Sequence, residues 1–143
     1  MNKTIATVGL IALLTMSGCA ITPETINRYP DIGKISTAGV GEAIYTYDKK
    51  GEQFIDYMSG KTINKTNSVK QEIIYSGFSK GVLRVTYREY INDYARAAFY
   101  QDATYDYAPP SSTMITFKGA QVEVLDADNT QIKYRVIKGF SNE

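Results

Sequence analysis

Hydrophobic and polar residues alternate along the last third of the chain. The stretch AQVEVLDADNTQIKYRVI, residues 120–137, has an apolar side chain at every second position on both sides of an Asp- and Asn-rich turn. Alternation with period two on both arms of one turn is typical of an antiparallel hairpin with one buried face. Asp and Asn favour the reversal itself because they hydrogen-bond their own backbone. We therefore predict a hairpin here.

The same reading extends upstream. A second hairpin is predicted in IIYSGFSKGVLRVTYREY, residues 73–90, with Gly77 and Gly81 bracketing the reversal. Turn residues divide most of the remaining chain into short runs, and twelve tyrosines with abundant Val, Ile and Thr favour strands. The predicted strands cover residues 42–48, 53–58, 70–78, 82–91, 98–107, 113–118, 120–126 and 130–137.

These runs define the predicted fold class, which is all-β. Short links between successive strands indicate an antiparallel meander, and a meander must bury one face and protect its edges. It can do so by closing as a small barrel, of the SH3-like or lipocalin-like kind, or by folding into a two-sheet sandwich. The pattern leaves both forms open.

The start of the chain has a different pattern. Residues 1–18 carry one charge, Lys3, followed by an apolar run that ends in Ser17 and Gly18, which is the plan of a secretory signal. The run is shorter than the roughly 20 apolar residues of a membrane span. Residues 20–40 are polar, contain two prolines and show no period, so we expect a flexible tether. The predicted organisation is a signal peptide (1–18), a lipidated cysteine with its tether (19–40) and one β domain (41–143).

The only cysteine of the chain, Cys19, follows the apolar run directly. The sequence Met16-Ser17-Gly18-Cys19 resembles the lipobox of bacterial lipoproteins. The resemblance implies cleavage after Gly18 and acylation of Cys19, with the lipid bilayer as a partner. Several acyl chains are needed for stable anchoring, since each buried methylene contributes only about 0.8 kcal/mol. Ala20 follows the cysteine where aspartate would favour inner-membrane retention, so the resemblance implies a cell-envelope protein of the outer membrane.

Charge and composition narrow the function classes. The 16 basic residues include Lys3 and face 15 acidic ones, so without the leader the chain is formally neutral and nucleic acid is not an expected partner. Histidine is absent, which removes the commonest general base and metal ligand. With Cys19 acylated no thiol is left. We therefore expect no enzyme activity, no cofactor and no metal.

Carboxylates are the remaining side chains that could support catalysis. A glycosidase-like pair could be drawn from four acidic residues, Glu89, Asp93, Asp102 and Asp106. Glu89 falls on the apolar face of its predicted strand, where an unpaired charge is costly. It must therefore be paired, bonded to tyrosine hydroxyls or displaced by a bulge, and our hypothesis for its partner is Arg96.

The densest group of binding-type side chains lies in residues 83–107. If strands 82–91 and 98–107 pair, Arg84 and Arg88 can face Asp102 and Asp106, next to a tyrosine-rich loop. Tyrosine and arginine are over-represented at binding hot spots. The predicted partner-binding residues are Arg84, Arg88, Tyr90, Tyr94, Arg96, Tyr100, Asp102 and Tyr105.

These features favour a non-enzymatic envelope lipoprotein whose β domain binds an envelope protein or peptidoglycan, or has a structural role. Two alternatives stay open. One is a carrier of a small apolar ligand inside a barrel, and the other is a carboxylate-based hydrolase of cell-wall glycan.

Overall fold

A computed structural model describes residues 20–95 and 100–141. These residues form antiparallel sheets and no helix, so the predicted all-β class is confirmed. In particular, they contain no helix that is long and apolar enough to cross a membrane. The eight predicted runs correspond to β4 (Ala43–Lys50), β5 (Gln53–Asp56), β7 (Val69–Ser79), β8 (Val82–Ile91), β10 (Gln101–Asp106), β11 (Thr113–Phe117), β12 (Ala120–Ala127) and β13 (Gln131–Lys138).

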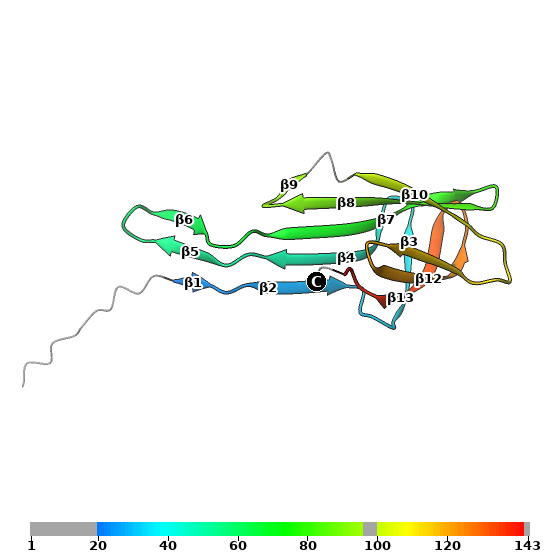
Figure 1. The fold of residues 1–143 in the computed structure, drawn as a ribbon, viewed down its shortest axis with the longest axis horizontal. Helices are drawn as coiled ribbons and strands as arrows, with labels where there is room; N and C mark the ends of the chain where they lie inside the picture. The colour runs from blue at the N-terminus through cyan, green and yellow to red at the C-terminus, as the bar shows by residue number, and fades with distance from the viewer. Residues whose placement is uncertain (1–19, 96–99, 142–143) are drawn as a thin grey trace, which may run out of the picture.

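The core lies between two sheets (Figure 1). The large sheet has the order β10-β8-β7-β4-β2, with β9 (Tyr94–Ala95) also paired to β8, and the small sheet has the order β11-β12-β13-β3. The described residues form no closed barrel, and a sandwich of open sheets fits the arrangement. Of the two predicted forms, the structure therefore has the sandwich.

Both predicted hairpins are present, and alternate residues of their strands face the core. In the β12–β13 hairpin the apolar row of each arm is buried, with Val122 opposite Val136 and Val124 opposite Tyr134. In the β7–β8 hairpin, Gly77 does not bracket the turn but lies inside β7, at a bulge where its φ is 109°. A bulge leaves one residue unpaired and increases the local twist.

Tyrosines take the place of larger aromatic residues in this core. Tyr45 and Tyr87 are fully buried, and both rings contact Phe140, with centroids 5.2 and 5.8 Å away. Tyr87 also stacks on Phe117 at 5.1 Å. Tyr75 is fully buried too and donates its hydroxyl proton to a backbone carbonyl of the β12–β13 turn, so its polar end is satisfied.

The predicted tether contains two edge strands instead. The strand β2 (Thr25–Tyr29) pairs with β4 in the large sheet, and β3 (Ile35–Gly39) pairs with β13 in the small sheet. The prediction of a flexible tether is therefore wrong for these residues. They lack alternation because an edge strand is held mainly by its backbone hydrogen bonds, which the side-chain pattern does not reveal.

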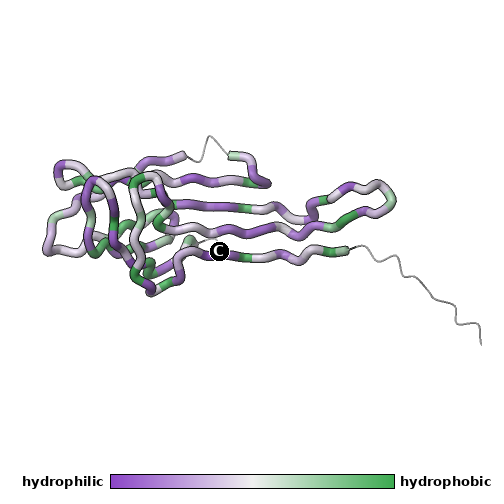
Figure 2. Tube along the Cα trace, turned by 180° about the vertical axis from the view of Figure 1, so that it is seen from behind, coloured by the Kyte–Doolittle hydropathy of each residue, from purple (hydrophilic) through white to green (hydrophobic). Residues whose placement is uncertain are grey.

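A narrow ribbon extends from one side of the sandwich and gives the molecule its elongated shape (Figure 1). It continues the line of β2, β4 and β7 in three shorter strands, β1 (Ile21–Thr22), β5 and β6 (Lys61–Asn64), which form a sheet in the order β1-β5-β6. Hydrophobic segments recur along this ribbon and at the start of β1, at the end remote from the sandwich (Figure 2).

The ribbon joins the large sheet at a seam, defined as Gly51–Glu52 on one strand line and 65–68 on the next. Gly51 donates its amide proton to the Ser68 hydroxyl at 2.9 Å, and the amide of Glu52 donates to the Thr66 hydroxyl at 2.7 Å. The amides of Lys65 and Thr66 both donate hydrogen bonds to the carbonyl of Glu52. The strands therefore break and restart without losing their connection.

Candidate functional site

Several of the predicted partner-binding residues lie on the outer face of the large sheet. The strands β8 and β10 pair as predicted, and the side chains of Arg84, Arg88 and Tyr90 leave β8 on the face that turns away from the core. Asp102 lies on the same face of β10, opposite Thr86. The structure thus brings these predicted residues to one surface.

The contacts on this outer face differ from the expected ion pairs. Arg84 lies opposite Thr104, and in the described part of the chain no ion pair joins Arg84 or Arg88 to Asp102. Asp102 accepts a hydrogen bond from the Thr86 hydroxyl at 2.7 Å instead, and Arg88 lies 5.5 Å from the centre of the Tyr100 ring. Around Asp102 and Arg88, hydroxyl and ring contacts therefore take the place of the expected ion pairs.

The other predicted residues separate from this group. Tyr105 lies on the opposite face of β10, packs against the core and donates its hydroxyl proton to the carbonyl of Thr116 at 2.7 Å, so its role is structural. Tyr94 lies on β9 and is 80% exposed. Arg96 and Cys19 lie outside the described residues, so neither the Arg96 pairing nor the lipidation is described by the structure.

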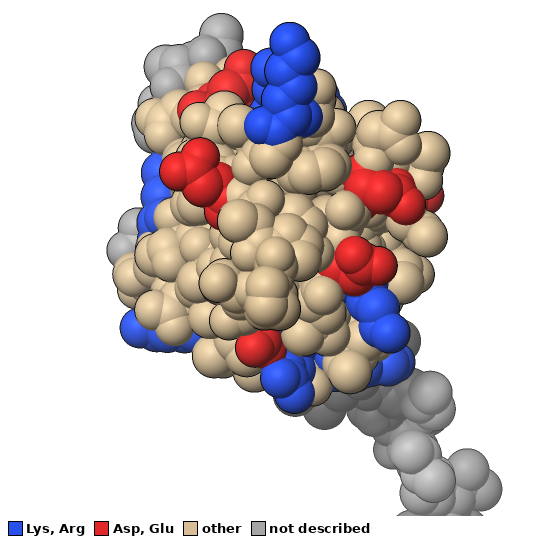
Figure 3. All heavy atoms as spheres, turned by 90° about the vertical axis from the view of Figure 1, so that its right-hand side faces the viewer, with Lys and Arg blue, Asp and Glu red and all other residues tan. Residues whose placement is uncertain are grey.

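Charged side chains are dispersed over the sandwich end of the molecule. On the face shown in Figure 3, acidic and basic residues are interspersed among uncharged ones and form no large area of one sign. A surface that binds nucleic acid instead presents a continuous basic patch.

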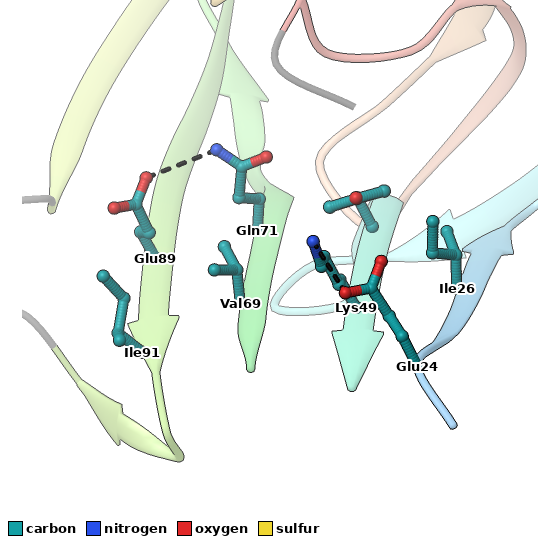
Figure 4. A pocket seen from close by; sticks show the side chains of 8 residues that line it. Glu24, Ile26, Lys49, Val69, Gln71, Glu89 and Ile91 are labelled. Carbon is teal, nitrogen blue, oxygen red and sulfur yellow. Dashed lines mark hydrogen bonds and ion pairs between the residues drawn. The ribbon is translucent and has the colours of Figure 1, made fainter. Parts of the chain in front are cut away.

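A depression lies on the inner face of the large sheet. It has a volume of about 430 Å³. Figure 4 shows its side chains rising from β2, β4, β7 and β8. We call it the inner groove, and its lining residues are Glu24, Ile26, Tyr47, Lys49, Val69, Gln71, Glu89 and Ile91.

A network around Glu89 closes one end of the inner groove. The Tyr87 hydroxyl donates to Oε2 of Glu89 at 2.6 Å, and Nε2 of Gln71 lies 3.3 Å from the same oxygen. Nε2 of Gln71 also donates to the Tyr87 hydroxyl at 2.8 Å. Nζ of Lys118 completes the group at 3.5 Å from Glu89. Of the three arrangements predicted for Glu89, the structure shows two, a bond from a tyrosine hydroxyl and an ion pair, and the cation of the pair is Lys118.

These contacts set the ionisation of the network. Burial alone would raise the pKa of Glu89, but the hydrogen bonds from Tyr87 and Gln71 and the charge of Lys118 outweigh it, so the pKa lies below its ordinary value. For Tyr87, burial and then the hydrogen bond to Glu89 raise the pKa well above its ordinary value. Glu89 is thus a stable carboxylate at neutral pH, and Tyr87 is a neutral donor.

Lys118 reaches Glu89 because of the turn on which it stands. Lys118 and Gly119 connect β11 to β12, with φ values of 45° and 86°. Two residues with positive φ are typical of the tight turn that suits a hairpin. A Cβ on Gly119 would overlap Ser141, so only glycine fits there. The turn sends Lys118 across to the large sheet, where its ammonium lies 4.3 Å from the centre of the Tyr87 ring.

Sequence reasoning missed Lys118 and the groove for different reasons. Lys118 comes from the other sheet, and no local pattern reveals a contact between sheets. Glu24 and Ile26 lie in the segment predicted to be a tether, where no pattern of residues indicates a site. The available signal was Glu89 itself, a charge on an otherwise apolar strand face.

We compared the chain with family models, curated proteins and solved structures. None of them matches it. The chemistry of the site must therefore be derived from its own geometry.

The opposite end of the inner groove is bounded by a second ion pair. Nζ of Lys49 lies 3.0 Å from Oε2 of Glu24, and the two side chains are about one-third exposed. Val69 lies between the two charged pairs (Figure 4). Ile91 lies beside Glu89 on β8, and Ile26 lies on the edge strand β2, next to Lys49. The groove therefore mixes aliphatic side chains with two charged pairs, which suits a ligand that carries both apolar and charged groups.

Proposed function

We propose that this chain is a lipid-anchored, non-enzymatic protein of the bacterial cell envelope that binds an extended segment of a partner protein in its inner groove. The proposal combines the lipobox-like sequence at Cys19 with an uncovered sheet face that carries both apolar and charged side chains. The proposed binding function is inferred from the inner groove. For the location, the outer membrane is the compartment that Ala20 favours.

The composition of the inner groove supports a peptide over a glycan. Sugar rings are commonly held by exposed aromatic faces, whereas the one aromatic residue of the lining, Tyr47, is only 4% exposed. The aliphatic side chains of the groove, Ile26, Val69 and Ile91, match apolar side chains of a protein. The ionised Glu89 and the Glu24–Lys49 pair stand among them and can orient charged groups of the same segment.

The geometry gives less support to the two alternatives. An apolar ligand inside a barrel needs a lumen, and the interior between the two open sheets is filled by side chains such as Tyr45 and Tyr87. A glycosidase needs two carboxyl groups within about 9.5 Å, one of them with a raised pKa. Glu24 and Glu89 stand three strands apart, about 14 Å at the usual strand spacing, and the pKa of Glu89 is lowered.

The anchor is tested by expressing the chain and its Cys19→Ser variant in a bacterial host. We expect mass spectrometry to find acyl groups on the wild-type chain, and we expect the variant to leave the membrane fraction. An unmodified wild-type chain, or a variant that remains in the membrane after a salt wash, would contradict the anchor.

Binding is tested by photo-crosslinking in living cells. A photoreactive residue replaces Ile26, which lines the inner groove and is 43% exposed, and a control replaces Thr104 on the outer face. We expect one discrete protein adduct from position 26 that disappears when Val69→Asp is added. Adducts from position 104 alone would indicate that the partner binds the outer face, and would contradict binding in the inner groove.

A further inference from the structure

The outer end of the ribbon combines two features that point to the same partner. The tip of the β5–β6 hairpin, defined as residues 57–60, exposes Met58 to 98% and Tyr57 to 60%. At the same end, the amide of Ile55 donates a hydrogen bond to the carbonyl of Ala20 at 3.2 Å. The first described residue of the chain is thus tied to the strand that leads into the tip.

The register brings the predicted anchor close to this tip. Because β1 and β5 are antiparallel, with Ile21 opposite Phe54, the chain runs towards the tip as it is followed back to Ala20. Cys19 is joined to Ala20 by one peptide bond, and successive Cα atoms are about 3.8 Å apart. Tyr57 is two residues beyond Ile55, about 7 Å along the strand.

These steps, with the spacing between paired strands, keep Tyr57 within roughly 15 Å of Cys19. A bilayer with its two polar interfaces is about 40–45 Å thick, and each interface contributes roughly 5–7 Å. A cysteine whose acyl chains lie in the hydrocarbon core therefore brings the tip within reach of the interface. Little free chain separates the cysteine from the ribbon, since the carbonyl of Ala20 is already hydrogen-bonded to Ile55.

The tip has a defined shape. Oδ1 of Asp56 accepts a hydrogen bond from the amide of Met58 at 3.0 Å, and Oδ2 accepts one from the hydroxyl of Ser59 at 2.6 Å. The amide of Gly60 donates to the carbonyl of Asp56 at 2.8 Å. The turn therefore presents Met58 and Tyr57 outward without folding them back onto the ribbon.

We propose that the tip of the β5–β6 hairpin is a second membrane contact, in which Tyr57 and Met58 enter the interface of the bilayer that holds acylated Cys19. This inference rests on the proposed lipid anchor. Tyrosine is enriched at membrane interfaces because it has an apolar ring and a polar end. The acidic residues of the hairpin, Glu52 and Asp56, are balanced by Lys61 and Lys65, so the contact depends on apolar burial and not on lipid charge.

The chain contains no tryptophan, which permits a direct test. The acylated Tyr57→Trp protein is reconstituted in vesicles of phosphatidylethanolamine and phosphatidylglycerol, with and without brominated acyl chains. The matched control is Ser79→Trp, because Ser79 is exposed at the β7–β8 turn, at the opposite end of the molecule (Figure 1). Met58→Trp repeats the measurement at the neighbouring position.

We expect brominated lipids to quench most of the emission from positions 57 and 58 and to leave that from position 79 unchanged. Equal emission with and without bromine at positions 57 and 58, in a chain shown by mass spectrometry to be acylated, would overturn the membrane contact and leave the anchor intact. A chain that carries no acyl group would overturn the anchor and this inference together.

Discussion

Glu89 is the residue on which the inner groove depends. It lies on the buried face of β8, yet it is charged, because three side chains from both sheets converge on its Oε2 atom. A hydrogen bond to a charged group contributes about 1.5–3 kcal/mol, and losing one partner of a buried group costs more than a surface pair would. The network therefore both stabilises the sandwich and fixes the chemistry of one end of the groove.

We predict that Glu89→Gln lowers the free energy of unfolding by about 1–3 kcal/mol at pH 7. The pKa of Glu89 is lowered in the folded chain, so its contribution is present above the ordinary value of 4.5 and is lost as the pH falls through the lowered value. The difference between wild type and variant should therefore shrink in acid. Chemical denaturation at pH 7 and at pH 3 measures it.

The matched control for this prediction is Glu123→Gln. Glu123 also pairs with a cation, since Nη2 of Arg135 lies 2.7 Å from Oε2 of Glu123, but that pair is more exposed to solvent. Exposed pairs contribute about 0–1 kcal/mol. Equal losses for the two variants would show that Glu89 behaves as an ordinary surface residue.

At the scale of the elements, the seam depends on a glycine. A Cβ at Gly51 would stand 2.1 Å from the carbonyl oxygen of Thr66, which is backbone and has little freedom to move. Because the two strand lines approach closely at this point, the ribbon can continue the large sheet. Any larger residue must push the two strand lines apart.

We predict that Gly51→Ala destabilises the chain by about 1–3 kcal/mol through overpacking. Gly39→Ala is the matched control, because a Cβ at Gly39 meets its nearest atom at an ordinary 3.5 Å. Thermal unfolding compares the two, and limited proteolysis should cut the Gly51→Ala ribbon first. An unchanged melting temperature for Gly51→Ala would show that the seam opens at little cost.

The elements also show which parts of the structure a sequence can reveal. The β12–β13 hairpin was predictable because its buried face produces strict alternation, and the same logic placed Glu89 on the inner face of β8. The strands β2 and β6 were not predicted because their side chains are exposed, and β3 was not predicted because only one of its residues, Ala38, is buried. The inner groove could not be predicted either. It forms only when β2 lies beside β4 and the β11–β12 turn lies beside β8, and the sequence pattern indicates neither arrangement.

At the scale of the whole molecule, the ribbon replaces the predicted tether. A flexible linker would allow the sandwich to take any orientation, whereas strands that continue across a bonded seam hold it in one direction. Along a straight strand the path from Lys61 to Ser79 is at most about 60 Å. The distance between the tip and the sandwich should therefore be both long and well defined.

We predict a single narrow distance distribution, below about 60 Å, between spin labels at Met58→Cys and Ser79→Cys in a Cys19→Ser chain. The control pair, Ser79→Cys with Leu125→Cys, lies wholly within the sandwich. Pulsed dipolar spectroscopy gives the width of both distributions. A broad distribution for the first pair alone would identify the seam as a hinge.

The pairing of β3 with β13 has a consequence for biosynthesis. These two strands come from opposite ends of the described chain, so β3 leaves the ribosome well before β13 and has no partner in the small sheet until β13 is made. Ladders between distant segments form slowly, because the loop between them must first be closed. The small sheet is therefore completed only after β13 has been made, and a chain that stops before Gln131 leaves the edge of β12 and the whole of β3 unsatisfied.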